Sequence, residues 1–69
     1  MVELTGWYET EQGAVLIDVE GETLAHCIEE CIRMDEDFGH TDFEVSLFDG
    51  EEHKDVTRLV YRMITCYDG

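Results

Sequence analysis

Proline is absent from this 69-residue chain, and basic residues are scarce: four Lys and Arg stand against 18 Asp and Glu, which gives a formal net charge of −14. Neutralisation of phosphates by Lys and Arg supplies most of the non-specific affinity of proteins for nucleic acid. The composition therefore excludes direct binding to DNA or RNA and predicts a basic partner. The sequence also lacks a basic N-terminal segment followed by an apolar run, and it has no run of about 18 apolar residues. We expect a soluble, cytoplasmic protein without a membrane partner.

The chain also lacks an even number of cysteines, since it has three: Cys27, Cys31 and Cys66. An odd number in a chain without a signal peptide argues against a disulfide framework and favours reduced thiols. Cys27 and Cys31 lie four residues apart on one face of a predicted helix, and this spacing without a second ligand pair does not match zinc motifs. We expect buried core thiols, with no bound metal and no other cofactor.

No arrangement of residues typical of catalysis is present. Ser46 is the only serine, and no glycine-rich phosphate loop or nucleophile elbow surrounds it. A calcium loop that starts at Asp35 would need an oxygen ligand where Gly39 stands and a glutamate where Ser46 stands. The three histidines have no partner whose spacing would position them as general bases. The sequence therefore predicts a protein that is not an enzyme.

The composition is that of a folded domain, since 43% of the residues are hydrophobic and 10% are aromatic. Alternating apolar residues predict strands over residues 2–9 and 14–20, joined in a hairpin by a short turn at residues 12–13. The same alternation predicts a third, half-buried strand over residues 42–48.

Helical spacing of apolar residues predicts a helix over residues 22–38. Thr23 is a suitable N-cap ahead of the first apolar residues. Gly39 follows the last of them and is typical of the residue that ends a helix.

The last segment is compatible with two structures. Residues 56–67 place apolar side chains at the spacing of a helix, and Asp49 followed by Glu52 has the form of a capping box. The same residues are rich in Val, Thr, Tyr and Ile, which prefer strands. We favour the helix, because its pattern is complete whereas intrinsic propensity is weak. The chain is then one α+β domain, residues 1–69, with a small antiparallel sheet and one long helix in the order β-β-α-β-α; the alternative order is β-β-α-β-β.

Negative charge is concentrated in one part of the sequence. Residues 1–52 hold 16 of the 18 acidic residues and a single base, Arg33, whereas residues 53–69 hold two acids and three bases. Repulsion among so many carboxylates lowers stability, and a net charge of about 2–8 already keeps a small domain in solution. Acidic residues seven apart on a helix repeat about every 10 Å, and those two apart on a strand about every 6–7 Å. Rows of carboxylates at these intervals can meet a track of Lys and Arg that reads phosphates.

In size, acidity and α+β pattern the chain resembles the small phage-encoded inhibitors that mimic DNA, a group that includes anti-CRISPR and antirestriction proteins. The resemblance implies a non-enzymatic inhibitor in the host cytoplasm, a monomer or weak homodimer, that mimics the charge of duplex DNA. Such a protein blocks the basic DNA-binding groove of a defence complex such as a CRISPR effector. The partner-binding residues that the resemblance implies are acids of the predicted helix and third strand: Glu22, Glu29, Glu30, Glu36, Asp37, Asp42 and Glu44.

Three other classes of function stay open at the level of sequence. The least favoured is a metal-dependent or hydrolytic enzyme, because no catalytic constellation is visible. Acidity is also a halophilic adaptation, in which carboxylates maintain hydration in molar salt, although such a surface would carry acids all round and residues 53–69 hold only two. A generic protein-interaction module would instead anchor its partner on exposed aromatic side chains. The candidates for that role are Trp7, Tyr8, Phe48 and Tyr61.

Overall fold

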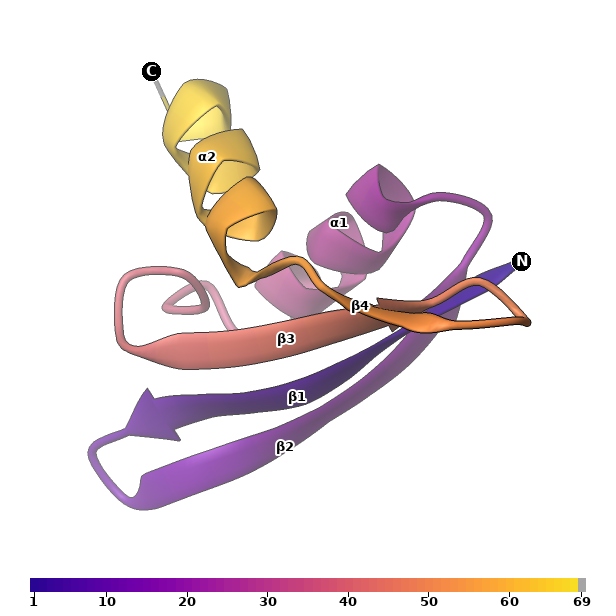
Figure 1. Ribbon diagram of the computed structural model, residues 1–69. Coiled ribbons are helices and arrows are strands. Elements are labelled where there is room, and N and C mark those ends of the chain that lie inside the picture. The colour runs from indigo at the N-terminus through magenta and orange to yellow at the C-terminus, as the bar shows by residue number, and fades with distance from the viewer. Residues whose placement is uncertain (69) are drawn as a thin grey trace.

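An antiparallel sheet and two helices make up the protein, in a computed structural model that describes the backbone of residues 1–68 and the side chains of residues 1–65. The strands have the spatial order β2-β1-β3-β4, and both helices lie on the same face of the sheet (Figure 1). This arrangement confirms the predicted α+β fold with a small antiparallel sheet. In chain order the elements are β1 (Val2–Thr10), β2 (Gly13–Gly21), α1 (Leu24–Met34), β3 (Phe43–Phe48), β4 (His53–Asp55) and α2 (Thr57–Asp68).

The first two strands form the predicted hairpin, which closes where Thr10 pairs with Gly13. On its other side β1 pairs with β3, and Gly6 lies opposite Val45 in that pair. A Cβ atom at Gly6 would collide with the carbonyl oxygen of Glu44. The close approach of the two central strands therefore depends on a residue without a side chain at this position.

Helix α1 begins as predicted and ends earlier than predicted. The Thr23 hydroxyl caps it by accepting a hydrogen bond from the backbone N–H of His26 at 3.2 Å. The helix stops at Met34, because Asp35 adopts an extended conformation (φ −153°, ψ 109°) and its carboxylate accepts the backbone N–H of Asp37 at 3.0 Å. A short side chain that bonds its own backbone in this way competes with the helix.

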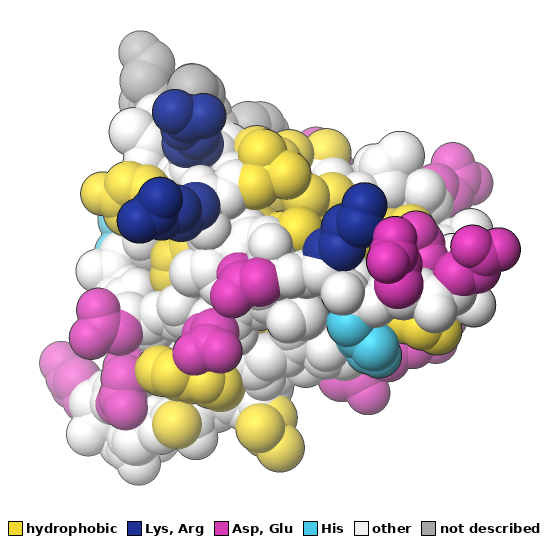
Figure 2. Space-filling view, in the orientation of Figure 1, with side chains coloured by type: hydrophobic (Ala, Val, Ile, Leu, Met, Phe, Trp, Pro, Cys, Tyr) yellow, Lys and Arg dark blue, Asp and Glu magenta, His cyan; other side chains and the backbone are white. Residues whose placement is uncertain are grey.

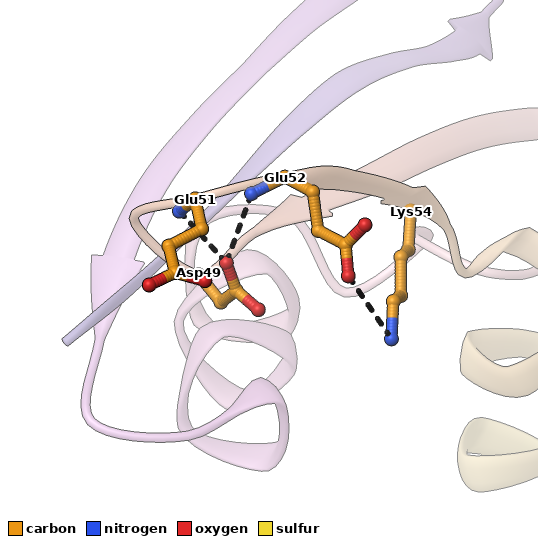
Figure 3. Close-up of polar contacts among 4 residues, drawn as sticks. All are labelled: Asp49, Glu51, Glu52 and Lys54. Atoms are coloured by element: carbon orange, nitrogen blue, oxygen red, sulfur yellow. Dashed lines mark hydrogen bonds and ion pairs between the residues drawn. The ribbon is translucent and has the colours of Figure 1, made fainter.

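The last segment contains both a strand and a helix, so the predicted element order lacks one short strand. The Asp49 carboxylate accepts the backbone N–H groups of Glu51 and Glu52 at 2.9 and 3.1 Å, in the turn that joins β3 to β4 (Figure 3). The predicted capping box is therefore wrong, since Asp49 caps a turn. Helix α2 begins eight residues later, where the Asp55 carboxylate accepts the backbone N–H of Thr57 at 2.8 Å.

The core lies between the helices and the sheet. Phe38 is 1% exposed and, although it follows α1, it packs edge-on against Tyr8 with ring centroids 5.7 Å apart. Met34 of the predicted apolar stripe is instead 75% exposed. The buried apolar residues are Leu4, Ile17, Cys27, Ile28, Cys31, Phe38, Val45, Val56, Val60 and Ile64.

The expectation of buried thiols is confirmed for Cys27 and Cys31. Burial raises the pKa of both thiols, and that of Cys31 reaches about 11. Both groups are therefore protonated and unreactive at neutral pH. The side chain of Cys66, for which burial was also expected, lies outside the described residues.

Candidate functional site

One face of the sheet is not covered by any element in the described part of the chain. Successive side chains of a strand point to opposite faces, and Leu4, Ile17 and Val45 point to the helices. The residues that alternate with them and pair across the strands therefore point away from the helices. We call this surface the open sheet face; it consists of Glu3, Thr5, Trp7 and Glu9 on β1, Ala14, Leu16, Asp18 and Glu20 on β2, Glu44, Ser46 and Phe48 on β3, and His53 and Asp55 on β4.

Carboxylates dominate the open sheet face, and none of its residues is Lys or Arg. Glu3 and Glu20 are paired directly across β1 and β2, a position in which Cβ atoms lie about 4.5–5.5 Å apart and like charges destabilise the sheet. Asp18 follows two residues from Glu20 on the same face, about 6–7 Å away. The sheet thus holds three carboxylates in a close group at the expense of its own stability.

The ionisation of Asp55 at the edge of this face is fixed by the start of α2. The backbone N–H of Thr57 donates to its carboxylate at 2.8 Å and holds the pKa of Asp55 below its usual range. The neighbouring Lys54 pairs with Leu47 and so points to the helix side, where its ammonium lies 3.7 Å from the carboxylate of Glu52 (Figure 3). That base therefore does not neutralise the open sheet face.

Aromatic and aliphatic side chains occupy the middle of the same face. Trp7, on the central strand β1, lies opposite Leu16 of β2 and Glu44 of β3. Leu16 is 86% exposed, which is unusual for a large aliphatic residue within a strand. At one end Phe48 stacks on His53 with ring centroids 4.6 Å apart. The open sheet face therefore combines an apolar centre with an acidic surround.

The structure separates the partner-binding residues predicted from the sequence into two sets. Glu44 lies on the open sheet face, and Asp42 lies at its end, where its carbonyl oxygen accepts the backbone N–H of Glu9 at 2.9 Å. The others come from α1, which lies on the opposite face of the sheet from Glu44, and from the segments that flank α1 (Figure 1). These are Glu22 ahead of α1, Glu29 and Glu30 on α1, and Glu36 and Asp37 in the loop that follows it.

The helix-side set is also less regular than predicted. The even repeat of Glu22, Glu29 and Glu36 requires a helix that continues to residue 36, whereas α1 ends at Met34. Glu30 is half-buried and forms an ion pair with Arg33 at 3.4 Å. Within the described side chains, the helix side therefore offers a more broken and partly neutralised set of carboxylates than the open sheet face.

The acids of β1 and the pairing that brings them against β2 were missed by sequence reasoning. Alternation within β1 places Glu3 and Trp7 on one face, so their common direction could have been predicted. That Glu20 lies directly opposite Glu3 depends on the hairpin register, which the turn between Thr10 and Gly13 sets.

Positive charge lies elsewhere on the molecule. Arg58 and Arg62 are exposed on α2, and Figure 2 shows Lys and Arg side chains over α2 and close to β4, with Asp and Glu side chains below α2 and at both ends of the sheet. The hollows on the described surface include two on the helix side. One, of about 560 Å³, is lined by Thr41, Asp42, Phe43, Thr57, Arg58, Tyr61 and Arg62, and the other, of about 500 Å³, lies between α1 and α2 and is lined by Ala25, Ile28, Glu29, Ile32, Arg33, Met63 and Ile64.

No group of three or more His, Cys, Asp or Glu side chains among the described residues is arranged to hold a metal ion. Over the same part of the chain, neither helix has the length and hydrophobicity needed to cross a membrane. Comparison with protein-family models, with curated proteins and with solved structures gives no match for this chain.

Proposed function

We propose that this protein is a non-enzymatic cytoplasmic inhibitor that mimics the charge of duplex DNA. It binds the basic DNA-binding groove of a defence complex, such as a CRISPR effector, and excludes the nucleic acid. The observation that carries the proposal is the open sheet face, on which Glu3 and Glu20 are held directly opposite each other with no Lys or Arg among the residues of that face.

The spacing of these carboxylates supports the proposal. Across β1 and β2 the paired residues are about 5 Å apart, and along β2 the distance from Asp18 to Glu20 is about 6–7 Å. Successive phosphates on one DNA strand are likewise several Å apart. The carboxylates stand on hydrogen-bonded strands, so the backbone loses little conformational entropy on binding. This small loss favours affinity.

The uneven distribution of charge would orient the protein as it approaches a basic groove. Arg58 and Arg62 belong to α2, on the helix side, and Arg58 reaches the edge of the open sheet face, where it lines a hollow with Glu44 and Asp55. A cationic partner therefore attracts the sheet and repels α2, and such complementarity raises association rates at low salt. The net charge of −14 also opposes close association of two copies, so the inhibitor acts as a monomer or weak homodimer.

Capture followed by competition tests the proposed function. The protein is immobilised, exposed at 50 mM NaCl to a prokaryotic lysate from which nucleic acid has been removed, and washed with increasing concentrations of duplex DNA. We expect the captured material to include a DNA-binding complex that duplex DNA releases. An uncharged polymer at the same concentration should release nothing. If saturating duplex DNA releases no captured protein, the proposed function is wrong.

Two charge-matched double variants then locate the binding surface. Glu20→Gln with Glu44→Gln removes two charges from the open sheet face, and Glu29→Gln with Glu36→Gln removes two from the helix side; all four side chains are exposed. We expect the sheet variant to bind the captured complex about tenfold more weakly, or ~1.4 kcal/mol, and the helix variant to stay within about twofold of the unmodified protein. The reverse order would place the interface on α1.

A further inference from the structure

Trp7 is half-buried on the open sheet face, and the charged residues around it are all acids. It stands on the central strand with Glu44 directly opposite on β3 and Leu16 directly opposite on β2. Glu9 follows on the same face of β1, and Asp18 lies at a diagonal position on β2. Directly paired Cβ atoms lie about 5 Å apart and diagonal ones about 7–8 Å, so these carboxylates are within side-chain reach of a group lying on the indole ring.

We propose that Trp7 is a binding site for an arginine side chain of the partner. The guanidinium plane lies on the indole face, and its N–H groups donate to the carboxylates of Glu44 and Asp18. This inference rests on the proposed function, because it names the residue type through which a basic groove engages the open sheet face.

Arginine fits this site better than lysine does. Guanidinium is planar and weakly hydrated, stacks on aromatic rings and donates to carboxylates through a fixed fork of N–H groups. Tryptophan is the best aromatic partner for a cation, and the attraction reaches about 2 kcal/mol when water is excluded. An ammonium ion is compact and strongly hydrated, so it gains less from the flat ring.

Other occupants of the site are disfavoured by charge. An apolar partner surface would remove water from Glu44 and Asp18 without supplying hydrogen-bond donors, which is unfavourable. A nucleic-acid base would bring phosphates against the same carboxylates, and a second copy would bring its own excess of negative charge. A cationic side chain satisfies the ring and the carboxylates together, and tryptophan at the centre of an interface is a common source of binding energy.

The intrinsic fluorescence of the protein reports this site directly, because Trp7 is the only tryptophan in the chain. The protein is titrated at 20 mM NaCl with two blocked peptides of equal charge, tetra-arginine and tetra-lysine. We expect saturable quenching by both, with the arginine peptide binding about three- to tenfold more tightly. Equal affinity for the two peptides would overturn the inference.

Variants separate ring stacking from bulk attraction, with affinities measured by calorimetry. In Trp7→Leu we expect both peptides to bind with the same affinity, because charge alone remains, whereas Trp7→Phe keeps a reduced preference for arginine. The control Tyr61→Leu alters an exposed aromatic residue on α2 and should leave the preference unchanged. A preference for arginine that persists in folded Trp7→Leu, as judged by circular dichroism, would also overturn the inference.

Failure of the arginine site and failure of the proposed function give different results. If duplex DNA releases Trp7→Leu and the unmodified protein from the captured complex at the same DNA concentration, the arginine site is wrong and charge mimicry stands. If duplex DNA releases nothing from the unmodified protein, the proposed function is wrong whatever the peptides show. Two results together support the arginine site. Trp7→Leu loses the preference for the arginine peptide, and duplex DNA releases it from the captured complex at a concentration at least threefold lower than it releases the unmodified protein.

Discussion

At the residue scale, a hydrogen bond between two side chains joins β1 to the first residue after α1. The Tyr8 hydroxyl donates to the Asp35 carboxylate at 2.8 Å. The backbone N–H of Asp37 is the main group that holds the pKa of Asp35 below its usual range, and the Tyr8 hydroxyl adds to this effect. The same hydrogen bond raises the pKa of Tyr8. The ionised form of Asp35 therefore stabilises the folded protein above pH ~4, and that contribution is lost as the pH falls through the lower pKa of the folded state.

The variant Tyr8→Phe tests this link. We expect the pKa of Asp35 to rise towards its ordinary value, because one donor to the ionised carboxylate is removed while the Asp37 N–H remains. The free energy of unfolding should fall at pH 7, and its difference from the unmodified protein should narrow below pH ~4, as Asp35 is protonated. Carboxyl carbon shifts in an NMR titration measure the pKa, with Tyr61→Phe as the control. A difference in the free energy of unfolding between Tyr8→Phe and the unmodified protein that stays constant through the acid range would contradict the prediction.

Single residues also explain where sequence patterns gave the wrong boundary. Asp49 and Asp35 both accept backbone N–H groups two residues further on. Such a bond is equally favourable in a turn and at a helix N-terminus, so the capping-box pattern at Asp49 could not distinguish the two. The apolar spacing that extended the first helix to Phe38 reports burial and contains no information on the backbone of Asp35.

At the scale of elements, the pairing of β1 with β2 predicts that one acid weakens the sheet. In Glu20→Gln the repulsion from Glu3 is removed, so we expect the free energy of unfolding at low salt to rise by about 0.2–1 kcal/mol. Urea denaturation measures the change. Glu29→Gln on α1 is the matched control, since it lowers the net charge equally without relieving a directly opposed pair. Equal stabilisation by the two variants would show that only total charge matters.

Strand alternation and helix periodicity predicted the hairpin, the third strand and both helices from residue types alone. They did not predict β4, because three residues, His53–Asp55, are too few to show a period. They also could not show that α1 and Glu44 lie on opposite sides of the sheet, since this depends on strand order and on which face the helices cover. The predicted binding residues are exposed acids apart from the half-buried Glu30. They were predicted as one surface, whereas the fold separates α1 from Glu44.

At the scale of the whole molecule, charge repulsion is barely offset by ion pairs. Among the described side chains, ion pairs join Arg33 to Glu30 at 3.4 Å and Lys54 to Glu52 at 3.7 Å, and of these four side chains only Glu30 is half-buried. Exposed pairs contribute about 0–1 kcal/mol each. The radius of gyration is 11.2 Å, which is smaller than the Debye length of about 30 Å at 0.01 M salt and greater than the value of about 8 Å at 0.15 M. Every carboxylate therefore repels every other at the lower ionic strength, and only near neighbours do so at the higher.

Salt should consequently have opposite effects on folding and on binding. Between 0.01 and 0.15 M NaCl we expect the Tm to rise by about 4–8 °C, which corresponds to ~1 kcal/mol for a domain of this size, because screening weakens the internal repulsion. Over the same range the affinity for the basic complex should fall, because screening also weakens the attraction. Calorimetric melts and binding titrations at matched salt measure the two effects. A halophilic domain would instead be unfolded at 0.01 M NaCl and would gain stability up to molar salt. A cooperative melt at 0.01 M NaCl, with a Tm that levels off near 0.2 M, would therefore exclude a halophilic adaptation and favour a surface that binds a cationic partner.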